Sequence, residues 1–217
     1  MSEQRRLLPA LAHAPLTAIY DPVVRLTTRE SVFKTELLRQ ADLQPGERVL
    51  DLGCGTATLA VAAKRAQPGA NIVGLDGDPR ILSQARAKAA LAGVELQLDE
   101  AMSDRMPYQD ASFDCVLSSL FFHHLDRTGK YATLRDIQRV LKPGGRLLVA
   151  DWGKAASPLM RIAFLLVQLL DGFESTRDNV EGLLPVLIRD SGFVDIRETG
   201  SFSTPLGTLA IYGATRI

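Results

Sequence analysis

The stretch Arg48-Val49-Leu50-Asp51-Leu52-Gly53-Cys54-Gly55-Thr56-Ala57 decides the fold of this chain. A short apolar run with β-branched character leads into a carboxylate, Asp51, and two glycines then bracket one residue. A helix-forming segment, 59–66, follows at once. Glycines let the backbone turn tightly and let a ligand approach closely, which a Cβ would obstruct. A strand, a glycine turn and a helix N-terminus in this order predict a nucleotide-type binding site.

Asp51 determines which ligand this turn favours. A dinucleotide places its pyrophosphate over such a turn, and a carboxylate at the end of the strand would repel it. S-adenosylmethionine (AdoMet) carries an ammonium group, a sulfonium and a ribose but no phosphate, so the same carboxylate would attract it. A dinucleotide fingerprint would also place a third glycine at position 58, where this chain has Thr58. The charge argument favours AdoMet over NAD.

The composition bounds the size, partners and surroundings of the protein. A chain of 217 residues is expected to form one domain. Lys plus Arg and Asp plus Glu both number 25, so there is no basic field for nucleic acid. Cys54 and Cys115 are expected at opposite ends of neighbouring strands, so we expect no disulfide and a cytoplasmic location. The N-terminus lacks a continuous apolar signal core, and no apolar run reaches the roughly 18 residues of a membrane span.

Strand and helix patterns alternate along the chain, which predicts a parallel sheet with helices on both faces. Strands are expected at 49–52, 72–75, 95–98, 113–118 and 146–150. Helices are expected at 28–41, 59–66, 79–92, 130–141 and 158–170, and another from Asp178 to Gly192 with a bend at Pro185. The last two strands, 193–198 and 208–214, are joined by a connection too short for a helical crossover, so they should pair antiparallel.

Four segments carry a resemblance to a known family. They are VLDLGCGT at 49–56, VGLD at 73–76, MPYQDASFD at 106–114 and VLKPGGR at 140–146. In this order the chain resembles the class I AdoMet-dependent methyltransferases, in particular the type 11 group that includes ubiquinone and menaquinone C-methyltransferases. The resemblance implies an α/β, Rossmann-like seven-stranded sheet of order 3-2-1-4-5-7-6 with strand 7 antiparallel.

We expect this single domain to have four parts. An N-terminal arm and helix, 1–44, would act as a cover, and 45–152 would form the cofactor-binding core. A helical insertion, 153–192, would lie on the substrate side, and 193–217 would form the C-terminal strand pair.

Cofactor contacts are implied residue by residue. Asp51, with the backbone around Gly53, Cys54 and Gly55, corresponds to the family's contact with the methionine part of AdoMet. Asp76 corresponds to the acidic residue that binds the ribose hydroxyls. A carboxylate at that strand end can accept two hydrogen bonds from a vicinal diol, whatever the family.

The chain departs from the family pattern at two places. Ala57 replaces the third glycine of the motif, and Met102-Ser103 stands where many relatives have an Asp-Ala pair that binds adenine. Met102 could pack on the adenine ring, with nearby backbone making the polar contacts. The remaining expected cofactor contacts are Gly77, Ser118 and Tyr20. Tyr20 resembles a residue of relatives whose arm closes over AdoMet, and a plain packing role for it stays open.

Candidate catalytic residues follow the fourth and fifth predicted strands, at the sheet edge where ligands bind in open α/β folds. His123 or His124 could act as a general base, since histidine titrates near neutrality. Asp151 could orient or deprotonate a nucleophile. The alternative is that the histidines are structural and that Asp151 caps a turn. We expect no metal site, because adjacent residues rarely face one ion together and only His13 remains elsewhere.

The segment 158–170 is apolar almost all round a helix, with Arg161 and Gln168 as exceptions. We expect it to cover the site and line an apolar pocket; an ordinary core helix and a membrane-surface helix are the alternatives. Methyl transfer mainly needs collinear alignment, which can lower the barrier by about 7–11 kcal/mol. The expected function is therefore an AdoMet-dependent methyltransferase that acts on a small or medium, apolar or lipid-like acceptor and releases S-adenosylhomocysteine (AdoHcy). A non-catalytic AdoMet-binding protein and an NAD-type oxidoreductase are the alternatives.

Overall fold

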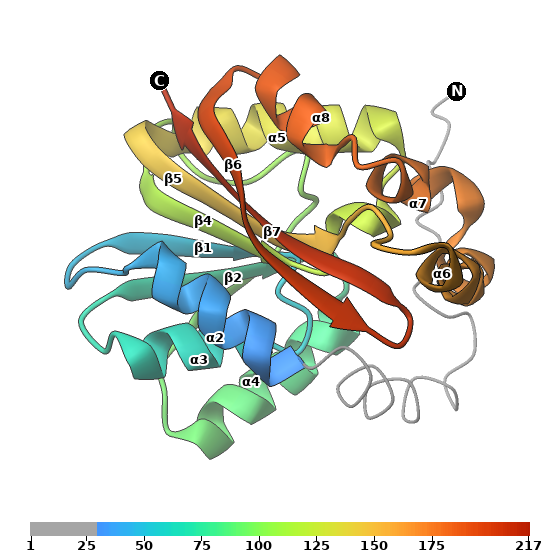
Figure 1. The fold of residues 1–217 in the computed structure, drawn as a ribbon. Coiled ribbons are helices and arrows are strands. Elements are labelled where there is room, and N and C mark those ends of the chain that lie inside the picture. Colours follow the sequence, from blue (N-terminus) through green and yellow to red (C-terminus); the bar gives the residue numbers. More distant parts are fainter. Residues whose placement is uncertain (1–29) are drawn as a thin grey trace, which may run out of the picture.

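The computed structural model of the chain describes residues 30–217, apart from the side chains of residues 159, 170 and 171 (Figure 1). The predicted contact of Tyr20, and the predicted start of the first helix, lie outside the described residues. None of the described helices combines the length and apolar composition that a bilayer crossing needs.

A seven-stranded sheet forms the centre of the molecule, in the order β3-β2-β1-β4-β5-β7-β6 (Figure 1). The strands are β1 (Arg48–Leu52), β2 (Asn71–Asp76), β3 (Gln97–Glu100), β4 (Phe113–Ser119), β5 (Leu141–Trp152), β6 (Phe193–Thr204) and β7 (Gly207–Arg216). Neighbouring strands from β1 to β5 pair parallel, whereas β7 pairs antiparallel with both β5 and β6. The predicted sheet order and the antiparallel last strand are confirmed.

Helices cover both faces of the sheet (Figure 1). One face carries α2 (Glu30–Ala41), α3 (Thr58–Ala66) and α4 (Pro79–Ala92), and the other carries α5 (Arg127–Val140) and α8 (Leu184–Asp190). Each face has its own buried apolar cluster. Three further elements lie toward the carboxyl ends of the parallel strands: the short 3₁₀ helix η1 (Phe122–His124), α6 (Pro158–Asp171) and α7 (Phe173–Val180).

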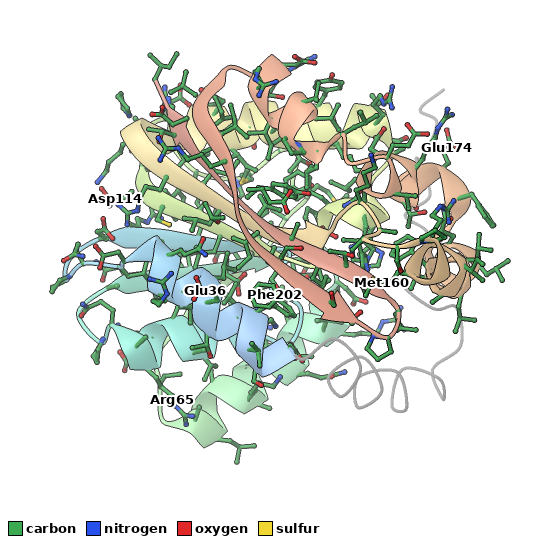
Figure 2. The ribbon with its side chains drawn as sticks, viewed as in Figure 1. Glu36, Arg65, Asp114, Met160, Glu174 and Phe202 are labelled. Carbon is green, nitrogen blue, oxygen red and sulfur yellow. The ribbon has the colours of Figure 1, made fainter. Side chains whose placement is uncertain are left out.

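The helix α6 is held by the hairpin of β6 and β7. The Thr208 hydroxyl lies 3.7 Å from the sulfur of Met160, which Figure 2 shows beside that hairpin. The inner face of α6 packs Phe164 edge-on against Trp152 at the end of β5, with 5.2 Å between the ring centroids. The insertion after β5 is therefore fixed to the sheet edge on which the candidate site residues lie.

Several predicted bounds were wrong: β3 lies at Gln97–Glu100 rather than 95–98, and β6 continues past 198 to Thr204. The single helix predicted from Asp178 to Gly192 is two helices, α7 and α8. Pro185 lies in the first turn of α8, because a residue without a backbone N–H is tolerated there and not in a helix interior. Strand β5 begins at Leu141 and so includes residues 142–145, which were predicted to form a turn. At these residues the pairing of β5 with β4 shifts in register.

Candidate active site

The glycine turn after β1 is tied to β2 by two hydrogen bonds. The N–H groups of Gly53 and Cys54 both donate to the carbonyl oxygen of Leu75, at 2.9 and 3.0 Å. Gly53 has φ +67°, and the ring of Phe121 packs directly over it. A Cβ at Gly55, where φ is +53°, would meet no heavy atom within 4 Å. The turn is thus closely packed at Gly53 and open at Gly55, which leaves its backbone room for a ligand.

Asp51 is buried at the start of the turn. Its Oδ2 accepts a hydrogen bond from the N–H of Ala60 on α3 at 3.0 Å. Burial raises the pKa of the Asp51 carboxyl to about 7, against the opposing charge of Lys34. A buried carboxyl with this pKa is poised to ionise beside a cationic group, as the predicted ammonium contact requires. Burial also raises the pKa of the Cys54 thiol, so no nucleophilic role is supported for it.

Asp76 connects the turn to the start of α4. Its Oδ2 accepts from the N–H of Gly55 at 2.9 Å, and its Oδ1 accepts from the N–H of Asp78 at 3.0 Å. A carboxylate offers about four acceptor positions, so two remain for a diol. Next to it, a Cβ added to Gly77 would lie 3.3 Å from the sulfur of Met102. The residues predicted to contact the ribose and the adenine, Asp76 and Met102, are therefore neighbours at one edge of the sheet.

Two predicted cofactor contacts have hydroxyls that bond within the protein. The Ser103 and Thr133 hydroxyls share a buried hydrogen bond at 2.8 Å. The Ser118 hydroxyl donates to the carbonyl oxygen of Leu52 at 3.0 Å. The Ser103 hydroxyl links the loop after β3 to α5, and the Ser118 hydroxyl links β4 to β1, so a cofactor contact from either residue would come from its backbone.

Two of the predicted catalytic residues, His123 and Asp151, are in contact. Nδ1 of His123 lies 2.7 Å from Oδ1 of Asp151, and both side chains are almost fully buried. Asp151 also accepts from the N–H groups of Phe121, His123 and Trp152, at 3.2, 3.3 and 2.7 Å. Burial alone would raise the pKa of Asp151, but its interaction and hydrogen bond with the ring of His123, together with the N–H of Trp152, hold it below its ordinary value. Asp151 is therefore an ionised carboxylate that fixes the ring of His123.

His124 is placed differently from His123. Its side chain is exposed, and its ring packs on that of His123 with 4.0 Å between the centroids. Of the two histidines, His123 is the one that a carboxylate orients.

Two features of the site were missed in the sequence. Phe121 covers the glycine turn while its N–H binds Asp151, which connects the cofactor side to the histidine. Lys130, on α5, is fully buried and contacts α7. The position of β4 and β5 as neighbours in the predicted sheet could have suggested the pairing of His123 with Asp151. No sequence signal indicated that Lys130 is buried.

Known proteins are similar to this chain in sequence and in fold. Residues 49–145 match the family model described as a methyltransferase domain. Over 106 residues the chain is 40% identical to a demethylmenaquinone methyltransferase of Thermus thermophilus, a match that covers 49% of this chain and 47% of that protein. The chain spans only 35% to 52% of the length of such curated relatives.

Solved structures superpose on most of the chain. The apo form of the S-adenosylmethionine-dependent methyltransferase SibL gives a TM-score of 0.66 at 25% identity, over 86% of this chain and 55% of that one. The YcgJ protein of Bacillus subtilis gives 0.69 at 16% identity, over 84% of this chain and 97% of that one, which shows the fold alone.

Residues 49–145 thus match the model of a methyltransferase domain, and the fold of the chain is similar to that of the S-adenosylmethionine-dependent methyltransferase SibL. The chain is similar to the menaquinone methyltransferase group, as the four sequence segments predicted.

Proposed function

We propose that this chain transfers the methyl group of AdoMet to a small or medium, apolar or lipid-like acceptor by in-line displacement. One residue carries the proposal. The ring of Phe121 packs on Gly53 of the glycine turn, and the N–H of Phe121 donates to Asp151 at 3.2 Å. Phe121 thus contacts both the turn that would hold the methyl donor and the carboxylate that orients His123.

The residues present fit AdoMet. Asp51 would attract the ammonium group, Asp76 would accept from the ribose hydroxyls, and Gly55 leaves space for the ligand to approach. Met102, 42% exposed, would lie beside the adenine ring, and Gly77 next to it has no side chain to fill that space. When bound, AdoMet supplies an electrophilic methyl group on a positively charged sulfur.

His123 is proposed to remove the proton that the acceptor loses. If Nδ1–H donates to Asp151, Nε2 is the basic nitrogen of the ring, as general-base catalysis requires. Asp151 would hold this tautomer and stabilise the ring once it is protonated. Trp152, whose ring centroid lies 6.5 Å from that of His123, would form an apolar wall nearby.

The apolar class of acceptor is inferred from two observations. The described part of α6 packs Phe164 and Val167 inward and presents four large aliphatic side chains outward. They are Ile162, Leu165, Leu166 and Leu169. The demethylmenaquinone methyltransferase that the chain resembles acts, by its name, on a quinone-type lipid. We propose that the insertion 153–192 and the N-terminal segment 1–44 cover such an acceptor and exclude water.

A transfer assay tests this function. Purified protein is incubated with methyl-labelled AdoMet and a panel of naphthohydroquinones, phenols and amines, and labelled product is extracted. We expect label in an apolar hydroxylated acceptor, and inhibition by AdoHcy. Binding of AdoHcy without transfer to any acceptor class would favour the non-catalytic alternative.

A further inference from the structure

Lys130 has no role in the proposed reaction, yet its surroundings are unusual. Among the described residues it is the only lysine or arginine whose side chain is fully buried. Its ammonium donates to the carbonyl oxygen of Ser175 at 2.6 Å and lies 3.4 Å from Oδ2 of Asp178. A buried ammonium is costly unless it is paired and hydrogen-bonded. The chain therefore maintains a positive charge at this point inside the protein.

The charge of Lys130 interacts with that of Asp151, which contacts the ring of His123. Helix α7 packs against η1, the turn that carries His123. Two consecutive residues of α7 reach both places: Asp178 contacts Lys130, and the Asn179 side chain donates to the carbonyl oxygen of Trp152 at 3.0 Å. Trp152 is the residue after Asp151. The single helix α7 thus contacts Lys130, η1 and the residue that follows Asp151.

We propose that Lys130 is a positioning residue that keeps the ring of His123 neutral, and thus able to accept a proton, beside the ionised Asp151. This inference rests on the proposed role of His123 as base. A carboxylate at 2.7 Å favours the protonated ring, whereas a nearby ammonium disfavours it. The two effects oppose each other, so the buried cation offsets part of the influence of Asp151.

The charged and titratable groups around the pair fall on several elements. They are His124 on η1, Lys130 and Arg127 on α5, Asp178 on α7 and Tyr212 on β7. Arg127 is half-exposed and bound to Asp178 through Nε at 2.9 Å. Burial lowers the pKa of Lys130, and the charges of Asp178 and Asp151 oppose this, which places all three groups in one electrostatic cluster.

Titration of the histidine rings by nitrogen-15 nuclear magnetic resonance tests this inference without any methyl acceptor. The chain has three histidines, so an H123N spectrum suffices to identify the signal of His123. In Lys130→Met, the loss of the cation should raise the titration midpoint of His123 by about one pH unit. In Asp178→Asn, the cation loses its counter-charge, so the midpoint should fall.

Lys142→Met is the matched control. Lys142 pairs with Asp114 at 2.6 Å, and Figure 2 shows Asp114 at the opposite side of the molecule from Glu174 of α7. This variant should leave the midpoint unchanged. Shifts of opposite sign in K130M and D178N support the inference, because general loosening of the fold would move both midpoints the same way. An unchanged midpoint in either variant, or shifts of the same sign, would overturn it.

The inference remains testable if one variant fails, and it can be separated from the proposed function. If K130M does not fold, the direction of the D178N shift decides alone. If the midpoints move as stated but no acceptor is ever methylated, the electrostatic role of Lys130 stands and the proposed reaction fails.

Discussion

The ring of Phe121 lies so close over Gly53 that a Cβ added to the glycine would come within 2.3 Å of a ring carbon. Gly53 also has φ +67°, a conformation that costs a side-chain-bearing residue about 1–2 kcal/mol. With overpacking of about 1–3 kcal/mol, Gly53→Ala should lower the free energy of unfolding by roughly 2–5 kcal/mol. Urea denaturation measures this loss.

Gly55→Ala is the control for the glycine turn. Its φ of +53° carries the backbone cost, but no heavy atom lies within 4 Å of the added Cβ. The expected loss is only about 1–2 kcal/mol. The double variant G53A/F121A should recover much of the stability that G53A loses. Equal losses in G53A and G55A would mean that the contact with Phe121 is unimportant.

The pKa of Asp51 predicts how cofactor binding depends on pH. Because burial raises this pKa to about 7, the carboxyl is increasingly protonated below neutrality. An ammonium group needs the ionised form, so AdoHcy binding should weaken up to about tenfold for each pH unit below 7. Calorimetric titration between pH 5 and pH 8 (roughly the range over which such a group changes charge) measures the slope. Asp51→Asn should bind weakly, and its affinity should not follow this slope.

The same shift has a consequence for stability. Asp51 holds its proton more tightly in the folded state than in the unfolded state, so its contribution to stability is full below the ordinary pKa near 4. That contribution is lost as pH rises toward about 7. The difference in free energy of unfolding between wild type and Asp51→Asn should therefore change over this window and level off above it. A difference that stays constant with pH would contradict the shifted pKa.

His123 and Asp151 should affect the chemical step more than cofactor binding. On an identified acceptor, His123→Asn should lower kcat by about 10²–10⁴, the usual contribution of a general base. Asp151→Asn should lower kcat as well, because the ring loses the acceptor that fixes its tautomer. His124→Asn is the matched control and should retain most activity. Wild-type rates in H123N would exclude a catalytic histidine at this position.

Side chains on the inner face of α6 should contribute more to the free energy of unfolding than those on its outer face. Phe164 is 3% exposed and packs on Trp152, whereas Leu166 is 57% exposed. Phe164→Ala should cost about 3–5 kcal/mol, and Leu166→Ala much less than 1 kcal/mol. Thermal or urea unfolding of the two variants compares them directly. A large loss of stability in L166A would show that another part of the protein covers the outer face.

Local sequence and chain topology were sufficient to predict the sheet. The strand, glycine turn and helix at 48–66 determine the first unit, and parallel pairing follows from the helices between successive strands. The short connection before β7 (Gly207–Arg216) required an antiparallel strand, as observed. Helices α7 and α8 were predicted as one helix because Pro185 was interpreted as a bend, although proline also suits a first turn.

The site was predictable only as a set of residues at one sheet edge. That Asp151 faces the N–H groups of η1 depends on how the chain turns after β4, which strand patterns do not specify. The hydroxyls of Ser103 and Ser118 are directed to partners in the protein by tertiary packing. A lysine such as Lys130 is ordinarily exposed, and its burial follows from a partner 48 residues away on α7.

The central claim is that the turn after β1 binds AdoMet. Calorimetric titration of the wild-type protein with AdoHcy, with NADH as the control and Asp76→Ala as the comparison variant, tests it most directly. We expect micromolar-range binding of AdoHcy, no binding of NADH and at least about tenfold weaker binding of AdoHcy to D76A, since hydrogen bonds to a charged group contribute about 1.5–3 kcal/mol. Binding of NADH instead, or AdoHcy affinity unchanged by D76A, would contradict the account.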